Sequence, residues 1–380
     1  MQIPKSIEQS FKVSYNYKLH FTKNLFDVSN RLFFDVLKNY SDTKPVKLLF
    51  VLDGGVVKAH PNLQKQIEAY SHKYNNILEL RASVVITGGE DSKIDSENLD
   101  NVLQAINDFN ICRHSFVVAV GGGAIIDMVG YAAAIAHRGV KLIRVPTTVL
   151  SQNDSAVGVK NSINYFGKKN FLGTFAPPYA IINDEKFLKT LEQRDWISGI
   201  SEAIKVALIN DKAFFKDIAE SANKLKNRDA ESMQYLIFKC AQLHMEHIAQ
   251  GGDPFESGSS RPLDFGHWAA HKLEHMTQYS LRHGEAVAIG MVIDLTYAKL
   301  IGLISQDTLN SIINVIEAIG FNLKLPIKQG DISTLIHGIE EFREHLGGEL
   351  TITLISEIGK KHDVHEIDFY KMEIAITSLL

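Results

Sequence analysis

Four short apolar runs, each followed at once by small or polar residues, constrain the fold of this chain most strongly. They are residues 48–52, 83–86, 116–120 and 142–145. Each has the length and composition of a β-strand. Helix-like stretches such as residues 96–110 separate several of them, and this alternation indicates a parallel sheet with both faces covered. We therefore predict an α/β, Rossmann-like domain, in which ligands bind at the carboxyl ends of the strands.

The second half of the sequence has a different character, because long amphipathic segments replace the strands after about residue 184. These segments are residues 198–208, 213–225, 232–249, 266–276, 284–301 and 305–319. An apolar run at 350–355 is compatible with one more strand. A chain of 380 residues exceeds what one core usually supports. We predict an α/β domain over residues 1–184 and a mostly α-helical domain over residues 185–380, with a ligand-binding cleft between them.

Composition argues against several classes of function. A formal net charge of −4 gives no reason to expect a nucleic-acid partner. The N-terminus lacks the apolar core of a signal peptide, and no window reaches the roughly 18 apolar residues of a membrane span. The two cysteines, Cys112 and Cys240, lie far apart and predict no disulfide framework. We expect a cytoplasmic protein without a membrane partner.

Two polar loops follow predicted strands. Gly121, Gly122 and Gly123 would let the backbone approach a pyrophosphate beside a helix N-terminus. The usual G-x-G-x-x-G fingerprint is absent, so a plain tight turn explains these glycines equally well. Residues 88–93 form the second loop, which by itself could be a helix cap.

Residues 154–170 concentrate basic and amide side chains among glycines and small residues. They include Lys160, Lys168, Lys169 and Asn170. Ammonium and amide donors that converge in this way suit an anion such as phosphate. A solvated basic loop would have the same composition, so the segment alone leaves both interpretations open.

A carboxylate and three histidines form the clearest candidate cluster. Glu202 and Lys205 share one face of an apolar helix, where they are either a structural ion pair or part of a site. His267 and His271 are four residues apart on a probable helix, and His283 precedes another helix. Two histidines with Glu202 would make a His₂Glu metal site. No H-E-x-x-H motif occurs, which argues against a zincin protease.

Eight blocks, in the correct order, resemble the 3-dehydroquinate synthase superfamily of sugar-phosphate cyclases. They are GGEDSK (88–93), GGGAIID (121–127), HRGV (137–140), VPTTVLSQNDSAVGVK (145–160), GKKN (167–170), SEAIK (201–205), GHWAAH (266–271) and HGEAVA (283–288). Chance does not explain so many blocks at close spacing, so each weak signal strengthens the others.

The resemblance implies a role for each matching residue. It implies a divalent metal, Zn²⁺ or Co²⁺, held by Glu202, His267 and His283. It implies NAD contacts from residues at strand ends, namely Asp53, Glu90, Lys93, Gly121, Gly122, Gly123, Asp127, Thr147 and Thr148. It implies a catalytic and substrate pocket made of Asp154, Lys160, Lys169, Asn170, Lys205, Arg138 and His271, with Arg261 and Asp264 nearby. We also expect a homodimer.

The family's chemistry explains these residue types. In this family NAD⁺ transiently oxidises a ring hydroxyl, which acidifies the neighbouring C–H and lets phosphate leave by β-elimination. NADH then returns the hydride, the ring opens, and an intramolecular aldol reaction closes a carbocycle. The resemblance therefore implies a carbon–oxygen lyase in which NAD is recycled. Lys160 and Lys205 would stabilise developing oxyanions, and Lys169 with Asn170 would hold the phosphate.

Departures from the family pattern bear on the substrate. Where 3-dehydroquinate synthases have an asparagine, three residues before the first metal histidine, this chain has Asp264. No lysine occurs between Lys239 and Lys272, and residues 342–350 replace a lysine-rich stretch. Fewer cationic and amide donors weaken the case for a substrate carboxylate, although Arg261 could still meet one. The chain resembles most the valiolone-synthase branch and the branch found in bacterial ebo-type gene clusters.

Two other classes remain open on the sequence alone. Glycerol dehydrogenases and iron-dependent alcohol dehydrogenases have a similar layout, but they would release NADH. A catalytically silent binding protein could keep the fold, although the intact Glu202, His267 and His283 set argues against it.

Overall fold

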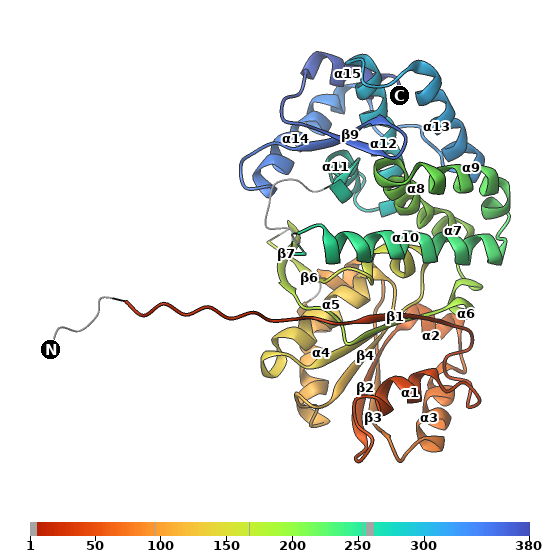
Figure 1. Cartoon of the computed structure of the whole chain (residues 1–380), viewed down its shortest axis with the longest axis vertical. Coiled ribbons are helices and arrows are strands. Elements are labelled where there is room, and N and C mark those ends of the chain that lie inside the picture. The colour runs from red at the N-terminus through yellow and green to blue at the C-terminus, as the bar shows by residue number, and fades with distance from the viewer. Residues whose placement is uncertain (1–5, 95, 167, 253, 256–261) are drawn as a thin grey trace.

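A parallel sheet forms the lower body of the molecule and a helical body lies above it (Figure 1). The computed structural model describes residues 6–380 except 95, 167, 253 and 256–261. The sheet has six strands in the order β1-β8-β5-β4-β2-β3, all parallel. These are β1 (Lys18–Thr22), β2 (Val46–Asp53), β3 (Leu78–Ile86), β4 (Phe116–Gly121), β5 (Lys141–Pro146) and β8 (Ala180–Asp184). The predicted α/β, Rossmann-like class is confirmed.

Alternate side chains of the central strands enter two separate cores, as the period of a strand requires. Phe50 of β2 packs among α1 (Leu32–Lys38) and α3 (Leu63–Lys73). Its neighbour Val51 faces α4 (Ser96–Asp108) and α5 (Gly123–Ile135) on the other side. Because both faces are covered, the four predicted strands contain near-continuous apolar runs.

The carboxyl ends of four neighbouring strands meet at one edge, which faces the helical body. The chain runs from β2 outward to β3, and β4 then pairs on the opposite side of β2. This reversal is the topological switch point where open α/β sheets bind ligands. Asp53 ends β2 and Gly121 ends β4, so both lie at this point.

Residues 151–175 form structure that the sequence analysis does not resolve. A turn of π-helix covers Ser151–Ser155, and β6 (Lys160–Tyr165) and β7 (Lys168–Phe175) form an antiparallel hairpin. Arg144 of β5 is fully buried and donates to the carbonyls of Ala156, Gly158 and Lys160. This guanidinium therefore fixes the path of the chain between the π-turn and the hairpin.

The helical body contains the segments predicted from periodicity. Its helices are α6 (Glu185–Leu188), α7 (Gln193–Ser198), α8 (Ile200–Asn210), α9 (Lys212–Lys226), α10 (Ala230–Gln250), α11 (His267–Met276), α12 (His283–Leu300), α13 (Gln306–Ile319), α14 (Ile332–His345) and α15 (Phe369–Thr377). Strands β9 (Ile352–Glu357) and β10 (Lys360–Val364) form a hairpin. The six predicted segments correspond to α8–α13 and the late apolar run to β9, so the mostly helical second part is confirmed.

Helix α10 runs along the seam between the two bodies (Figure 1). The sheet's last strand ends at Asp184, where we place the domain boundary, and that boundary stays a prediction. In the part of the chain that the structure describes, no helix is long and apolar enough to cross a membrane.

Candidate active site

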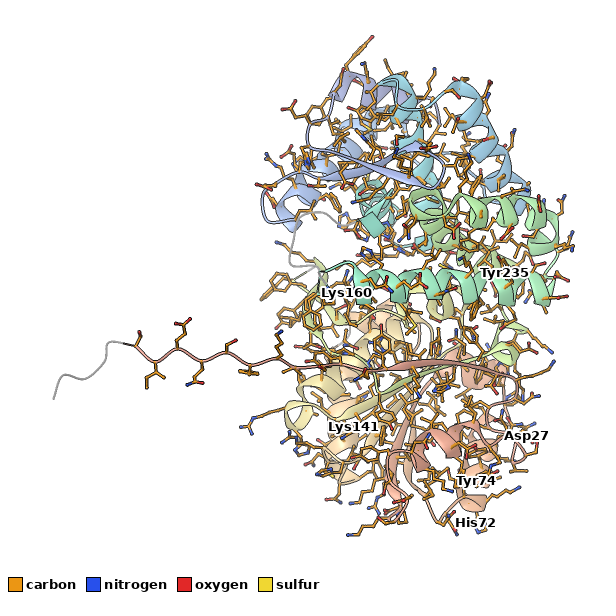
Figure 2. The ribbon with its side chains drawn as sticks, in the orientation of Figure 1. Asp27, His72, Tyr74, Lys141, Lys160 and Tyr235 are labelled. Carbon is orange, nitrogen blue, oxygen red and sulfur yellow. The ribbon has the colours of Figure 1, made fainter. Side chains whose placement is uncertain are left out.

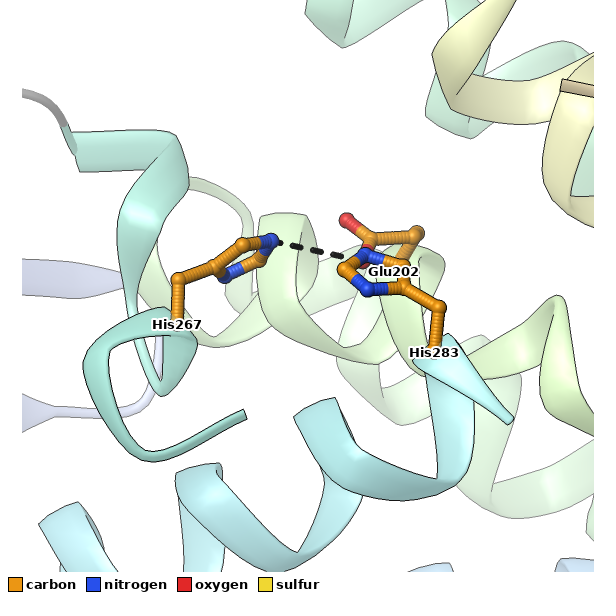
Figure 3. Close-up of side chains that lie close together, drawn as sticks. All are labelled: Glu202, His267 and His283. Atoms are coloured by element: carbon orange, nitrogen blue, oxygen red, sulfur yellow. Dashed lines mark ion pairs between the residues drawn. The ribbon is translucent and has the colours of Figure 1, made fainter. Parts of the chain in front are cut away.

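Three donor side chains from three helices converge in the helical body: Glu202 of α8 and the first residues of α11 and α12, His267 and His283 (Figure 3). Glu202 Oε1 lies 3.8 Å from His267 Nε2 and 3.6 Å from His283 Nε2. This oxygen is buried and accepts no hydrogen bond from any described residue, while Oε2 pairs with Lys205. A buried carboxylate oxygen that accepts no hydrogen bond and faces two imidazole nitrogens fits a divalent cation.

The far nitrogen of each imidazole is held by the protein. His267 Nδ1 lies 3.1 Å from the carbonyl oxygen of Phe265, to which it can donate. His283 Nδ1 lies 3.2 Å from Glu274 Oε2. A metal-binding histidine usually donates its second N–H to a carbonyl or carboxylate, because this fixes the tautomer and the ring orientation. Both contacts leave Nε2 directed at Glu202.

Close contact between α11 and α12 places His267. Asp294 of α12 is fully buried and accepts from the Gly266 amide at 3.0 Å and the Trp268 indole at 2.8 Å. Gly266 has a φ of +77°, and a Cβ on Gly290 would lie 2.1 Å from its carbonyl oxygen. Only glycine lets the two backbones approach so closely, so α11 begins where His267 faces Glu202.

Burial and charge set the protonation of the donors. Burial, and then the charge of Lys205, lower the pKa of His267 well below its usual value, which keeps the imidazole neutral. Burial would also lower the pKa of His283, but the charge of Glu274 and contacts with both carboxylates raise it to about 9. A divalent cation would compete with that proton, because histidine binds metal only in its neutral form.

Glu274 joins the metal-type cluster to the hairpin. Its carboxylate, 5% exposed, accepts from Lys169 Nζ at 2.9 and 3.0 Å and contacts His283. Burial would lower the pKa of Lys169, but the charges of Glu274 and Glu90 outweigh it and raise this pKa, so the ammonium remains charged. His271, Glu274 and His283 also lie within metal-binding distance of one another. Because Lys169 already neutralises Glu274, we favour the Glu202 set.

We predict that Glu274→Gln weakens metal binding by about 10- to 100-fold, since outer-shell partners of metal-ligating histidines contribute about that much. The amide keeps the volume but loses the charge that orients His283. Titration of the purified apoprotein with Zn²⁺ measures the effect. Glu341→Gln is the matched control. Glu341 of α14 pairs with Lys272, which lies on the same helix as Glu274, and it contacts none of the three donors. Equal affinity of both variants would refute this role.

A second buried network connects the sheet edge to the hairpin. Lys93, 3% exposed, donates to Asp127 Oδ2 at 2.8 Å and also to Asn170 Oδ1. Asn164 Oδ1 accepts from the Asn170 amide, and Asn164 Nδ2 donates to Glu90. Predicted cofactor residues and the predicted phosphate ligand Asn170 therefore belong to one hydrogen-bonded unit.

Asp154 and Lys205 meet at the seam. Asp154 Oδ1 lies 3.0 Å from His244 Nδ1 of α10. Burial would raise the pKa of Asp154, but His244 and Lys205 hold it well below its usual range. Burial would lower the pKa of Lys205, but the negative charges of Glu202 and Asp154 outweigh this effect and raise that pKa. The half-buried carboxylate of Asp264 adds to the rise.

The glycine loop leaves space at one position only. A Cβ on Gly121 would lie 2.8 Å from Ile125 Cβ, and one on Gly123 would lie 2.6 Å from Ser155 Oγ. A Cβ on Gly122 would meet only Thr148 Cγ2, at 3.4 Å. Thr147 donates its amide to the Gly121 carbonyl, so the ends of β4 and β5 line one opening before the N-terminus of α5. This cradle fits a pyrophosphate.

The remaining predicted residues differ in their placement. Lys160 is exposed at the start of β6, at the level of α10 (Figure 2). His271 is exposed beside the other two imidazoles. Arg138 is exposed and precedes β5, whose first residue, Lys141, lies below Lys160 in Figure 2. Thr147 follows the opposite end of this strand. Within one chain, the structure therefore does not bring Arg138 together with the other predicted pocket residues, and its role there stays a prediction. Arg261 lies outside the described residues.

Several supporting residues escape sequence reasoning: Glu274, His244, Asp294 and Arg144. Glu274 is three residues after His271 on the same helix, so helical spacing is the one signal that could have indicated it. The other three act through contacts between distant segments, which carry no local pattern.

The fold and the donor set define a two-domain enzyme with a Rossmann-like sheet and a helical second body. Residues 83–198 match the family model described as 3-dehydroquinate synthase N-terminal, and residues 199–341 match 3-dehydroquinate synthase C-terminal. The chain belongs to the 3-dehydroquinate synthase-like family of sugar-phosphate cyclases, which are phosphate-eliminating carbon–oxygen lyases. The predicted resemblance is confirmed, and so is the enzyme class. The two family models meet after residue 198, beyond the boundary we predict at 184.

Individual relatives cover most of the chain. A 3-dehydroquinate synthase of Shewanella sp. (strain MR-4) is 34% identical over 301 residues, which are 79% of this chain and 82% of that protein. The solved 2-epi-5-epi-valiolone synthase of Streptomyces hygroscopicus subsp. jinggangensis 5008 is 25% identical, with a TM-score of 0.87 over 98% of this chain and 99% of that one. A solved 2-deoxy-scyllo-inosose synthase has a TM-score of 0.79 at 22% identity, covering 95% and 96%. The first structure holds NAD⁺ and Zn²⁺, and the second holds carbaglucose-6-phosphate, NAD⁺ and Co²⁺.

Proposed function

We propose that this protein is a metal- and NAD-dependent cyclase that converts a neutral-headed seven-carbon sugar phosphate, such as sedoheptulose 7-phosphate, to a carbocycle with loss of phosphate. One observation carries the proposal: Glu274 links His283 of the metal-type set to Lys169 of the hairpin. A phosphate held by Lys169 would therefore lie beside a cation held by Glu202, His267 and His283. A polyol dehydrogenase acts on a substrate without phosphate, so it has no need for a phosphate-binding lysine at this place.

Both cofactors fit residues of this chain. The Glu202 oxygen that accepts no hydrogen bond and the two oriented imidazoles suit Zn²⁺ or Co²⁺, the ions present in the two solved relatives. The opening at Gly122 suits the pyrophosphate of NAD, which both relatives also hold. When bound, NAD⁺ supplies reversible oxidation of a substrate hydroxyl, and the metal supplies polarisation of that oxygen.

The chain's own residues would bind the substrate and stabilise charge. Lys205, buried and permanently charged, lies where it can hold a developing oxyanion, and Lys160 would approach from β6. Lys169 would release part of its contact with Glu274 to meet phosphate. His271 is exposed beside the donor set and can exchange a proton with a substrate hydroxyl. The seam between sheet edge and α10 would exclude water.

The preference for a neutral head group follows from Asp264. This carboxylate is half-buried and close enough to Lys205 to affect its pKa, so it carries negative charge into the pocket. A substrate carboxylate would face like charge there and would lose a charge-assisted hydrogen bond. Such a bond contributes about 1.5–3 kcal/mol, or roughly ten- to a hundredfold in affinity.

We predict that kcat/KM for sedoheptulose 7-phosphate exceeds that for the carboxylated substrate of 3-dehydroquinate synthase by roughly ten- to a hundredfold. Phosphate release with catalytic NAD is the readout. Asp264→Asn should narrow the ratio, because it removes the repulsion, whereas Asp307→Asn on the exposed start of α13 should leave it unchanged.

The second candidate is 3-dehydroquinate synthase itself, which the name of the Shewanella relative favours. Higher efficiency on the carboxylated substrate would establish it and reject our proposal. Stoichiometric accumulation of NADH would instead indicate a dehydrogenase. A cytoplasmic location stays a prediction.

A further inference from the structure

His244 of α10 belongs neither to the metal set nor to the glycine loop, yet it faces the predicted pocket residue Asp154. Its Nδ1 lies 3.0 Å from Asp154 Oδ1, across the seam between the two bodies. Nδ1 itself is buried, whereas the side chain as a whole keeps 11% of its surface exposed. A Cβ on Gly158 would lie 3.9 Å from Nε2, so this second nitrogen faces the chain that leads into β6.

The two side chains have the arrangement of a proton-transfer pair. A carboxylate beside Nδ1 accepts the N–H of that nitrogen and leaves the lone pair on Nε2, which can then take up a proton. Burial would raise the pKa of Asp154, but His244 and Lys205 lower it, so the carboxylate stays ionised and can orient the ring. Among the described residues, none forms a hydrogen bond with Nε2. A pair that only joined α10 to the π-turn would have no need of this open nitrogen.

A row of charged and polar side chains connects the predicted phosphate ligand to this pair. From one end to the other it consists of Lys169, Glu274, His283, Glu202, Lys205, Asp154 and His244. Successive members contact each other, except that Lys205 and Asp154 interact through their charges. The metal set lies in the middle of the row. A substrate with its phosphate at Lys169 would therefore have its far end directed at His244.

That far end carries a hydroxyl whose proton must move. A seven-carbon ketose phosphate in its ring form has the phosphate on its last carbon and the anomeric hydroxyl on its second carbon. After phosphate has left, the ring opens when the anomeric hydroxyl gives up its proton. Closure of the carbocycle then needs a proton at the same oxygen, so one group that accepts and returns this proton serves both steps.

We propose that His244, oriented by Asp154, is the catalytic base and acid of ring opening and carbocycle closure, an inference that rests on the proposed cyclase activity. In opening, Nε2 takes the anomeric proton, the O–H electron pair forms the carbonyl, and the ring C–O bond breaks to leave an enolate on the former ring oxygen. In closure, the terminal carbon of this enolate attacks the carbonyl carbon, and the new alkoxide takes the proton back from His244. Atoms and charge balance, so no co-reactant is needed.

His244→Asn tests the assignment, because the amide can still donate to Asp154 but offers no basic nitrogen. The protein is loaded with metal and NAD⁺, and the sugar phosphate is labelled with ¹³C at the phosphate-bearing carbon. In a single turnover we expect phosphate release within about threefold of wild type and carbocycle formation slower by about 100-fold or more, the usual contribution of a general acid–base residue. NMR of quenched samples distinguishes the vinylic carbon of the unopened intermediate from the saturated carbon of the carbocycle.

Two further variants separate chemistry from folding. His72→Asn is the matched control, since His72 is exposed on α3 at the far end of the α/β body and should leave both rates unchanged (Figure 2). His244→Ala removes the ring, and added imidazole should restore carbocycle formation by occupying the space that the ring leaves.

The outcomes distinguish this inference from the proposed function. Carbocycle formation that keeps pace with phosphate release in His244→Asn would overturn the role of His244 alone, as would a His244→Ala protein that imidazole does not restore. The test uses whichever of the two candidate sugar phosphates the wild-type chain cyclises faster, because both carry an anomeric hydroxyl. A wild-type chain that releases phosphate from neither would overturn the proposed function and this inference together.

Discussion

Replacing His267 with alanine is expected to release the divalent ion and to lower turnover by about a thousandfold or more. A catalytic metal contributes several kcal/mol of transition-state stabilisation, and each 1.36 kcal/mol corresponds to a factor of ten in rate. His267 supplies one of three donors, and its Nε2 faces the Glu202 oxygen that accepts no hydrogen bond. Without it, only the imidazole of His283 and the buried carboxylate of Glu202 remain, which is too few donors for the site that we propose. Elemental analysis of the dialysed protein and phosphate release measure the two effects.

His275→Ala is the matched control for this variant. His275 lies on the same helix but is exposed and is not part of the donor set, so it should retain both metal and activity. Thermal unfolding distinguishes lost ligation from lost folding. A His267→Ala protein that is folded and still holds one equivalent of metal would exclude our assignment.

Much of the fold could be predicted because its local signals agree with its tertiary structure. The buried strands β2, β4 and β5 and the edge strand β3 contain apolar runs, and helices α9 and α13 have one apolar and one polar face. The edge strand β1 and the neighbouring β8 escaped the prediction. β1 continues an alternating segment whose first half is exposed, so its role depends on pairing with β8, distant in sequence. Periodicity carries no information about such a partner.

The sequence predicted which residues form the candidate site, but not all of the contacts that hold their side chains in place. The structure brings Glu202, His267 and His283 together, while the carboxylate that orients His283 was not identified. Arg138 shows that a residue close in sequence to the site need not lie close to it in the fold. It is close in sequence to Thr147, but a parallel strand separates the two by its full length, so only one of them reaches the ligand edge. Order along the chain therefore identifies motifs without saying which end of a strand they occupy.

Gly122→Val is expected to weaken NAD binding by about a thousandfold while leaving the fold intact. A pyrophosphate at this edge would accept hydrogen bonds from backbone amides at the start of α5, and a branched side chain would keep it away. Charge-assisted hydrogen bonds contribute about 1.5–3 kcal/mol each, so losing two of them has roughly this effect. Isothermal titration with NAD⁺ measures it without any requirement for turnover.

The choice of Gly122 rests on the neighbouring geometry. Side chains at Gly121 or Gly123 would collide with Ile125 or Ser155, so those variants would test folding. Gly122 has an extended backbone, with φ at −73°, and open space beyond Thr148. Gly330→Val is the matched control, since a Cβ there meets nothing within 4 Å and Gly330 lies in the helical body, away from the sheet edge. If Gly122→Val binds NAD⁺ as tightly as this control, the cofactor does not use the β4–α5 loop, and the opening beside Thr148 must serve another ligand.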